Sequence, residues 1–199
     1  MKLPTLLTLS RVPFLFLIVG LLYIDLTGIP SVIFCLFVFA GLTDWFDGYL
    51  ARKLNQVSNL GKLMDALADK IIILGMFITL LVFNILPDWS LVLVLLILVR
   101  ELLITGMRMV AVSSGVVLAA ELSGKHKTLF QIISIALLLF SLVIKNDLSF
   151  LFGRDLSQFA ETCHDMGVLL FVLASALTIY SGAAYLIKYG SIFIGDNSK

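Results

Sequence analysis

Residues 44–70 read DWFDGYLARKLNQVSNLGKLMDALADK, and apolar runs enclose this stretch: SVIFCLFVFAGL (31–42) precedes it and IIILGMFITLLVF (71–83) follows it. Apolar runs of this kind are typical of helices that cross a membrane. The stretch therefore predicts two membrane helices joined by a short polar turn. It carries four aspartates beside lipid-like segments: Asp44, Asp47, Asp65 and Asp69.

The whole chain has the composition of a helical membrane protein. Of its 199 residues, 60% are hydrophobic and only 14% are charged, which is too few charges for the surface of a soluble domain. A spanning helix needs about 20 mostly apolar residues, so this length can hold roughly six. We predict a single all-α membrane domain over residues 1–199, built as a bundle of six transmembrane helices. The expected spans are 8–25, 31–51, 63–86, 91–112, 127–145 and 166–189, and the longest polar connection is expected at 146–165.

The basic residues predict how the bundle is oriented, because cytoplasmic loops are enriched in Lys and Arg. We place the two termini, the 52–62 loop and the 113–126 loop on one side of the membrane. That side then holds 12 of the 14 basic residues, and the other side holds only Lys145 and Arg154. Both termini are therefore expected in the cytoplasm, with the four aspartates at the cytoplasmic end of the bilayer.

Helical geometry gathers the aspartates onto one face of each of two neighbouring helices. At 100° per residue, positions 44, 48 and 51 fall within about 60° of one another, and position 61 begins an i, i+4, i+8 stripe. A turn at about 52–60 makes the helices antiparallel neighbours, so the two faces can meet near the membrane surface. The faces consist of Asp44, Asp47, Gly48 and Ala51 on the first helix and of Gly61, Asp65 and Asp69 on the second.

Four carboxylates brought together repel one another strongly, and two divalent cations would neutralise their charge. Oxygen ligands suit Mg²⁺, Mn²⁺ or Ca²⁺, and the stretch offers no His or Cys for zinc. We expect two divalent cations, Mg²⁺ with Mn²⁺ as the alternative. The glycines and the alanine beside the carboxylates leave room for a ligand. A competing interpretation is that the aspartates are separate interfacial charges paired with neighbouring Lys and Arg side chains.

The same stretch resembles the signature of the CDP-alcohol phosphotransferase family, D-x2-D-G-x2-A-R-x8-G-x3-D-x3-D. This family transfers a phosphoalcohol group from a CDP-alcohol to a second alcohol and releases CMP. The resemblance implies six transmembrane helices, a homodimer and divalent metals. The eight matching positions are Asp44, Asp47, Gly48, Ala51, Arg52, Gly61, Asp65 and Asp69.

The resemblance also implies a role for each residue of the signature. Asp69 would act as the catalytic base as well as a metal ligand. The metal ligands implied are Asp44, Asp47, Asp65 and Asp69. The implied contacts with the CDP group are Asp44, Gly48, Ala51, Arg52 and Gly61.

A second polar group near the same membrane face bears on the acceptor. The fourth span ends in RELLITGMRMVA (100–111), and SGKHKTLFQ (123–131) opens the fifth. Cations beside a metal site favour an acceptor that carries its own phosphate. For Lys125 and Lys127 alone, an ordinary cytoplasmic basic loop remains an equal alternative. The expected contacts with the acceptor phosphate are Arg100, Arg108, Lys125, Lys127 and Gln131.

Most of residues 1–135 resemble one branch of the family, whose donor is CDP-diacylglycerol and whose acceptor is glycerol 3-phosphate. The resemblance implies phospholipid biosynthesis in the inner (cytoplasmic) membrane, with the active site facing the cytoplasm. One position differs, because Thr5 follows Pro4 where the family commonly has Asn. We expect direct attack of the acceptor hydroxyl, since no Ser or Cys nucleophile presents itself.

Two alternatives remain open. A sibling enzyme of the same family could use inositol phosphate, serine or phosphatidylglycerol as its acceptor. From a different class, intramembrane carboxylates could mark a divalent-cation or proton-coupled transporter, although transporters usually place polar residues and broken helices near the midplane. Release of CMP from CDP-diacylglycerol separates the enzyme from the transporter, and a panel of acceptors separates the siblings.

Overall fold

A computed structural model describes residues 3–53, 59–113 and 123–194, and side chains within 11–43, 67–68, 70–111 and 127–189. Every regular element of these residues is a helix, as the composition predicts. The elements are α1 (Leu3–Leu22), α2 (Ile29–Lys53), α3 (Asn59–Val82), α4 (Ser90–Ser113), α5 (Ser123–Leu142), the π-helix η1 (Val143–Leu148), α6 (Ser149–Phe152) and α7 (Ser157–Ile194).

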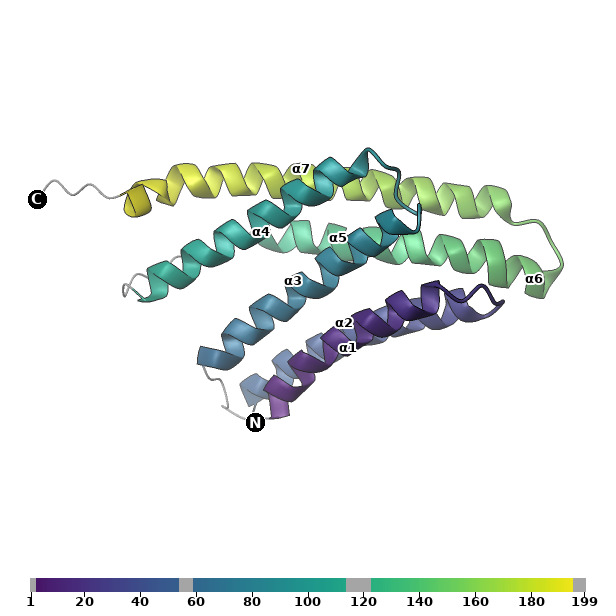
Figure 1. The fold of residues 1–199 in the computed structure, drawn as a ribbon, viewed down its shortest axis with the longest axis horizontal. Helices are drawn as coiled ribbons and strands as arrows, with labels where there is room; N and C mark the ends of the chain where they lie inside the picture. Colours follow the sequence, from purple (N-terminus) through teal and green to yellow (C-terminus); the bar gives the residue numbers. More distant parts are fainter. Residues whose placement is uncertain (1–2, 54–58, 114–122, 195–199) are drawn as a thin grey trace, which may run out of the picture.

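The long helices run back and forth along one direction (Figure 1). Helices α1 and α2 pack side by side, α5 lies along α7, and α3 and α4 connect these two pairs. One end of the bundle collects the ends of α2, α4 and α7 and the beginnings of α1, α3 and α5. We name it the aspartate end, because the end of α2 and the beginning of α3, which carry the four aspartates, lie there. The opposite end carries η1 and α6.

Three described helical segments are long and apolar enough to cross a membrane: Ser90–Ala111, Lys127–Phe152 and Ser157–Tyr189. Three shorter apolar segments belong to α1, α2 and α3, which makes six apolar helical segments in the described chain. This number fits the predicted bundle of six helices. Many of their apolar side chains face outward, where a bilayer would cover them, with Phe16 69% exposed and Val99 55% exposed.

The core of the bundle lies where α3, α5 and α7 meet. Met76 and Phe77 of α3, Ile135 of α5 and Phe171 of α7 are fully buried. The rings of Phe77 and Phe171 pack edge to face with their centroids 5.0 Å apart, a favourable arrangement for aromatic pairs. This ring contact holds α3 against α7 in the interior of the bundle.

The connection before α7 is much shorter than expected, and the prediction of a polar connection over 146–165 was wrong. Helix continues through η1 and α6 to Phe152, and α7 already begins at Ser157. The polar residues there end or begin helices instead. Gly153, with φ of 57°, ends α6 in the left-handed conformation that glycine adopts readily. The Asp155 carboxylate accepts a hydrogen bond from the Ser157 backbone N–H at 2.9 Å, which lowers the pKa of Asp155.

Candidate functional site

The aspartate stretch lies on two helices, as the spacing requires. The five signature residues from 44 to 52 belong to α2, and the three from 61 to 69 belong to α3. The helical backbone that makes two aspartate faces is therefore confirmed. The side chains of all eight residues lie outside the described set, so their contacts with metal and CDP stay predictions.

The donor set of the stretch fits divalent cations. Four carboxylates are hard oxygen ligands of the kind that Mg²⁺ and Mn²⁺ prefer. No group of three or more His, Cys, Asp or Glu side chains that could hold a metal occurs among the described residues. The signature carboxylates therefore stay the predicted metal ligands.

A small polar cavity lies next to this stretch, between α3, α4 and α5. Its volume is about 100 Å³. Lys70 lines it and directly follows Asp69 in the chain, so the cavity adjoins the signature of α3. We name it the polar cavity; its wall is formed by Lys70, Ile73, Leu74, Ile97, Glu101, Thr128 and Gln131.

Glu101 is the centre of the ion pairs in this wall. Its Oε1 atom accepts a hydrogen bond from Arg100 Nη1 at 3.0 Å and a second one from Lys127 Nζ. Glu101 and Lys127 are buried, with 8% and 5% of their surface exposed. A buried carboxylate is costly unless it is paired, and two cations offset that cost here. The pairs tie α4 to α5 beside the cavity.

Helix α7 also contacts this group of Arg100, Glu101 and Lys127, which we name the Glu101 cluster. Arg100 Nη2 donates a hydrogen bond to Ser181 Oγ at 3.0 Å. Gly182 leaves space for the same arginine, because a Cβ atom at Gly182 would lie 2.6 Å from Arg100 Cγ. One turn earlier, Gln131 Nε2 donates to Thr178 Oγ1 at a long 3.4 Å. The position of Arg100 thus depends on α7.

Arg108 belongs to a separate contact further along α4. Its guanidinium carbon lies 5.5 Å from the centre of the Tyr185 ring, a cation–π arrangement. Eight helical residues separate it from Arg100, which corresponds to about 12 Å along the axis. Arg108 Nε and Tyr185 Oη are both buried, and neither has a hydrogen-bond partner among the described residues. Arg108 therefore contacts Tyr185 of α7, apart from the ion pairs of Glu101.

The five residues expected to contact the acceptor phosphate therefore do not all lie together. Gln131 lines the polar cavity, and Arg100 and Lys127 are bonded to Glu101 in its wall. Arg108 packs on Tyr185 instead. The side chain of Lys125 lies outside the described residues. The cluster is also less cationic than its Lys and Arg residues alone suggest, because Glu101 neutralises one positive charge.

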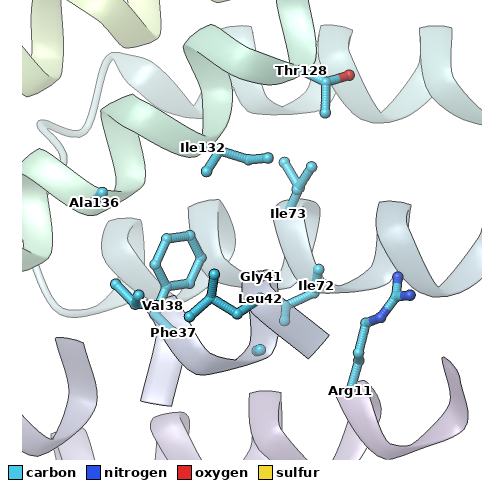
Figure 2. Close-up of a pocket in the computed structure, with 11 residues that line it drawn as sticks. Arg11, Phe37, Val38, Gly41, Leu42, Ile72, Ile73, Thr128, Ile132 and Ala136 are labelled. Carbon is cyan, nitrogen blue, oxygen red and sulfur yellow. The ribbon is translucent and has the colours of Figure 1, made fainter. Parts of the chain in front are cut away.

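A larger, mainly apolar cavity of about 310 Å³ adjoins the polar one (Figure 2). It lies between α2, α3 and α5, and the buried Arg11 of α1 stands at its edge. Ile73 and Thr128 line both cavities. We name it the apolar cavity; its other lining side chains include Phe37, Val38, Leu42, Ile72 and Ile132. The two cavities therefore provide neighbouring spaces for a hydrocarbon chain and for a polar group.

Several residues of this site were not among the predicted ones. Glu101 lies within the quoted fourth span, but only its basic neighbours were chosen as contacts. Thr178, Ser181 and Gly182 lie in an apolar helix whose small residues indicate only close packing. The available signal was their i, i+3, i+4 spacing, which places them on one face of α7.

Comparisons with known proteins agree with this picture. Residues 1–180 match the CDP-alcohol phosphatidyltransferase family. A Bacillus subtilis protein named CDP-diacylglycerol–glycerol-3-phosphate 3-phosphatidyltransferase is 47% identical over 104 residues, 52% of each chain. A Mycoplasma genitalium protein of the same name is 47% identical over 100 residues, 50% of this chain and 41% of its own. A Rickettsia bellii protein, also of that name, is 32% identical over 184 residues, 92% of this chain and 93% of its own.

The extent of these matches differs. The matched part of this chain spans about half the length of the Bacillus and Mycoplasma relatives and nearly the whole of the Rickettsia relative.

Proposed function

We propose, from the premise that this chain belongs to the CDP-alcohol phosphatidyltransferase family, that it transfers a phosphatidyl group from CDP-diacylglycerol to glycerol 3-phosphate. The products are phosphatidylglycerophosphate and CMP. One observation carries the choice of substrates: the polar and apolar cavities adjoin each other at Ile73 and Thr128, beside the aspartate stretch. Three relatives that carry the name of this activity support it.

The donor lipid would lie across α2, α3 and α5. The apolar cavity suits a hydrocarbon chain, because each Å² of apolar surface that leaves water stabilises the bound state by about 25 cal/mol. Arg11 at its edge offers a positive charge near the headgroup. The CDP group would be held by the signature residues Asp44, Gly48, Ala51, Arg52 and Gly61.

Two divalent cations, Mg²⁺ with Mn²⁺ as the alternative, would be held by the signature carboxylates. Bound there, they would neutralise the pyrophosphate and stabilise the departing CMP. The ligands proposed are Asp44, Asp47, Asp65 and Asp69.

The acceptor would enter the polar cavity with its phosphate toward the cations. Gln131 lines this cavity, and Arg100 and Lys127 are bonded to Glu101 in its wall. Arg108 and Lys125 would add positive charge at the same end of the bundle. Asp69 then accepts the proton of the distal hydroxyl while that oxygen attacks the β-phosphorus. A new phosphorus–oxygen bond forms, the bond to CMP breaks, and no covalent enzyme intermediate is needed.

We propose one domain over residues 1–199, in the inner membrane, with both termini and the active site on the cytoplasmic side. The bundle supports this orientation. Its aspartate end carries the beginning of α1 and the ends of α2, α4 and α7, and most basic residues of the chain lie near these helix ends in the sequence. Lys145 and Arg154 lie at the opposite end, in and after the η1–α6 segment. A homodimer is the assembly we propose from family resemblance.

The test is CMP release by purified protein given CDP-diacylglycerol, Mg²⁺ and one acceptor at a time. We expect CMP with glycerol 3-phosphate, and much less with inositol phosphate, serine or phosphatidylglycerol. Release with inositol phosphate but not with glycerol 3-phosphate would assign the chain to a sibling reaction. Absence of CMP with all four acceptors would refute the enzyme proposal.

A further inference from the structure

The two carboxylate oxygens of Glu101 have different surroundings. Both of its partners among the described residues, Arg100 Nη1 and Lys127 Nζ, donate to Oε1. Oε2 receives no hydrogen bond from the described residues, although Glu101 lines the polar cavity. An ionised carboxylate offers about four lone-pair sites. One side of this group is therefore committed to holding two cations, and the other is left for a ligand in the cavity.

A phosphate does not suit this remaining oxygen, because two anionic groups repel each other. A hydroxyl group does suit it, since an O–H can donate to the carboxylate. A ligand that satisfies the whole cluster therefore carries a phosphate for the cations and a hydroxyl for Glu101. The cavity also contains neutral polar groups, Thr128 and Gln131, that suit a polyol.

We infer that Glu101 determines acceptor specificity, with its Oε2 atom accepting a hydrogen bond from a non-reacting hydroxyl of a polyol phosphate. This inference rests on the proposed function and deepens it. In glycerol 3-phosphate the distal hydroxyl reacts, so the hydroxyl that Glu101 recognises is the middle one. Asp69 remains the proposed base.

The rigidity of Glu101 gives the contact its selectivity. Arg100 holds the carboxylate from α4 and is itself fixed by Ser181 of α7, while Lys127 holds it from α5. An acceptor atom held in place loses little freedom when the ligand binds. A ligand without the middle hydroxyl would leave Oε2 without a partner in a confined site, which is costly for a charged group.

Glu101→Gln is the variant that isolates this atom. It keeps the size of the side chain, and its amide oxygen can still face Arg100 and Lys127. Its NH₂ group then points into the cavity, where it replaces the free acceptor with a donor. Glu101→Asp is a second variant, which keeps the charge but withdraws the carboxylate from the cavity. Glu161→Gln, exposed at the far end of the bundle, is the matched control.

The experiment compares glycerol 3-phosphate with 3-hydroxypropyl phosphate, which lacks only the middle hydroxyl. With CDP-diacylglycerol and Mg²⁺, we expect the wild-type protein to prefer glycerol 3-phosphate by about 10- to 100-fold in kcat/KM, the range for a hydrogen bond to a charged group. Glu101→Gln and Glu101→Asp should bring this ratio close to one. Glu161→Gln should keep the wild-type ratio.

The inference is overturned if the wild type does not distinguish the two acceptors, or if both Glu101 variants keep the wild-type ratio. Calorimetric titration of each acceptor into the protein without donor gives the same comparison independently of turnover. If wild-type protein releases no CMP with glycerol 3-phosphate, the proposed function fails. The ratio of the affinities for the two acceptors, compared between wild type and Glu101→Gln, then still tests the role of Glu101. If neither acceptor binds measurably, the role proposed for Glu101 is refuted.

Discussion

Asp147 of η1 caps the beginning of α2 through Ser31, a residue 116 positions away in the chain. Its Oδ2 atom accepts hydrogen bonds from the Ser31 backbone N–H at 2.8 Å and from Ser31 Oγ at 2.5 Å. Its Oδ1 atom accepts a third from the backbone N–H of Gly28 at 2.7 Å. The first N–H groups of a helix have no partners within it, and a carboxylate there also interacts favourably with the helix dipole. One side chain therefore joins the second and fifth apolar segments.

Replacing Asp147 should destabilise the bundle without changing the chemistry. We expect Asp147→Asn to lower the free energy of unfolding by about 1–3 kcal/mol, because the amide accepts fewer hydrogen bonds and carries no charge. Thermal unfolding of the protein in detergent measures the loss. Asp165→Asn is the control, since the Asp165 side chain is 83% exposed and should change stability little. An unchanged midpoint for Asp147→Asn would show that this cap contributes nothing measurable.

Asp69→Asn should abolish CMP release while binding of CDP-diacylglycerol is largely kept, because the amide cannot accept the acceptor proton. We expect a loss of at least about 100-fold in kcat, the lower range for removal of a general base. A CMP assay and a donor-binding assay measure the two effects separately. Asp25→Asn, at the opposite end of the bundle, should behave like wild type. Full activity of Asp69→Asn would refute its role as base.

Gly182→Ala should weaken acceptor binding through Arg100. The added Cβ would lie 2.6 Å from Arg100 Cγ, so the arginine must move away from Ser181. Losing one such hydrogen bond corresponds to about a 5-fold increase in the KM for glycerol 3-phosphate, with the KM for CDP-diacylglycerol unchanged. Steady-state kinetics with each substrate varied in turn measure both constants.

Gly106→Ala is the matched control for this change. It places the same methyl group on α4, where a Cβ meets nothing within 4 Å. We expect unchanged kinetics and a small gain in stability, because Ala favours a helix more than Gly does. An equal change in KM for both variants would mean that the effect does not come from Arg100.

Gly41→Phe should block the donor instead of the acceptor. Gly41 lines the apolar cavity, and a Cβ there meets no atom within 4 Å. The larger side chain can therefore fill the space that we assign to an acyl chain. We expect a higher KM for CDP-diacylglycerol and no change for glycerol 3-phosphate. Gly20→Phe, which adds the same ring to an open position on α1, should leave both constants unchanged.

Much of the fold could be predicted because membrane helices depend on properties that a sequence displays directly. Apolar length gives the helices, and the described residues contain the six apolar segments expected. The connection before α7 could not be predicted in the same way. Its polar residues resemble those of a loop, but Asp147 and Asp155 accept hydrogen bonds at the beginnings of helices. The partner of Asp147 lies 116 positions away in the chain, so this contact depends on the fold.

The candidate site was predictable in part for a similar reason. A cation inside an apolar span is conspicuous, so Arg100 could be chosen as a contact. Lys127 was chosen as well, although a basic loop explained it equally well. Glu101 was less conspicuous because its role depends on which cations it pairs with. Ser181 and Gly182 carry no charge, and their importance comes from contact with Arg100 across the α4–α7 interface. Such contacts between distant segments do not follow from helical spacing.

Because α7 helps to position Arg100, the reaction and the recognition of the acceptor would depend on different parts of the chain. The signature that would carry the reaction lies on α2 and α3, whereas the side chains that hold Arg100 in place lie about 120 residues further along the chain. Selection can therefore alter the preferred alcohol by changing a few small residues of the last helix. The family could diversify its lipids in this way while the machinery of phosphate transfer stays the same.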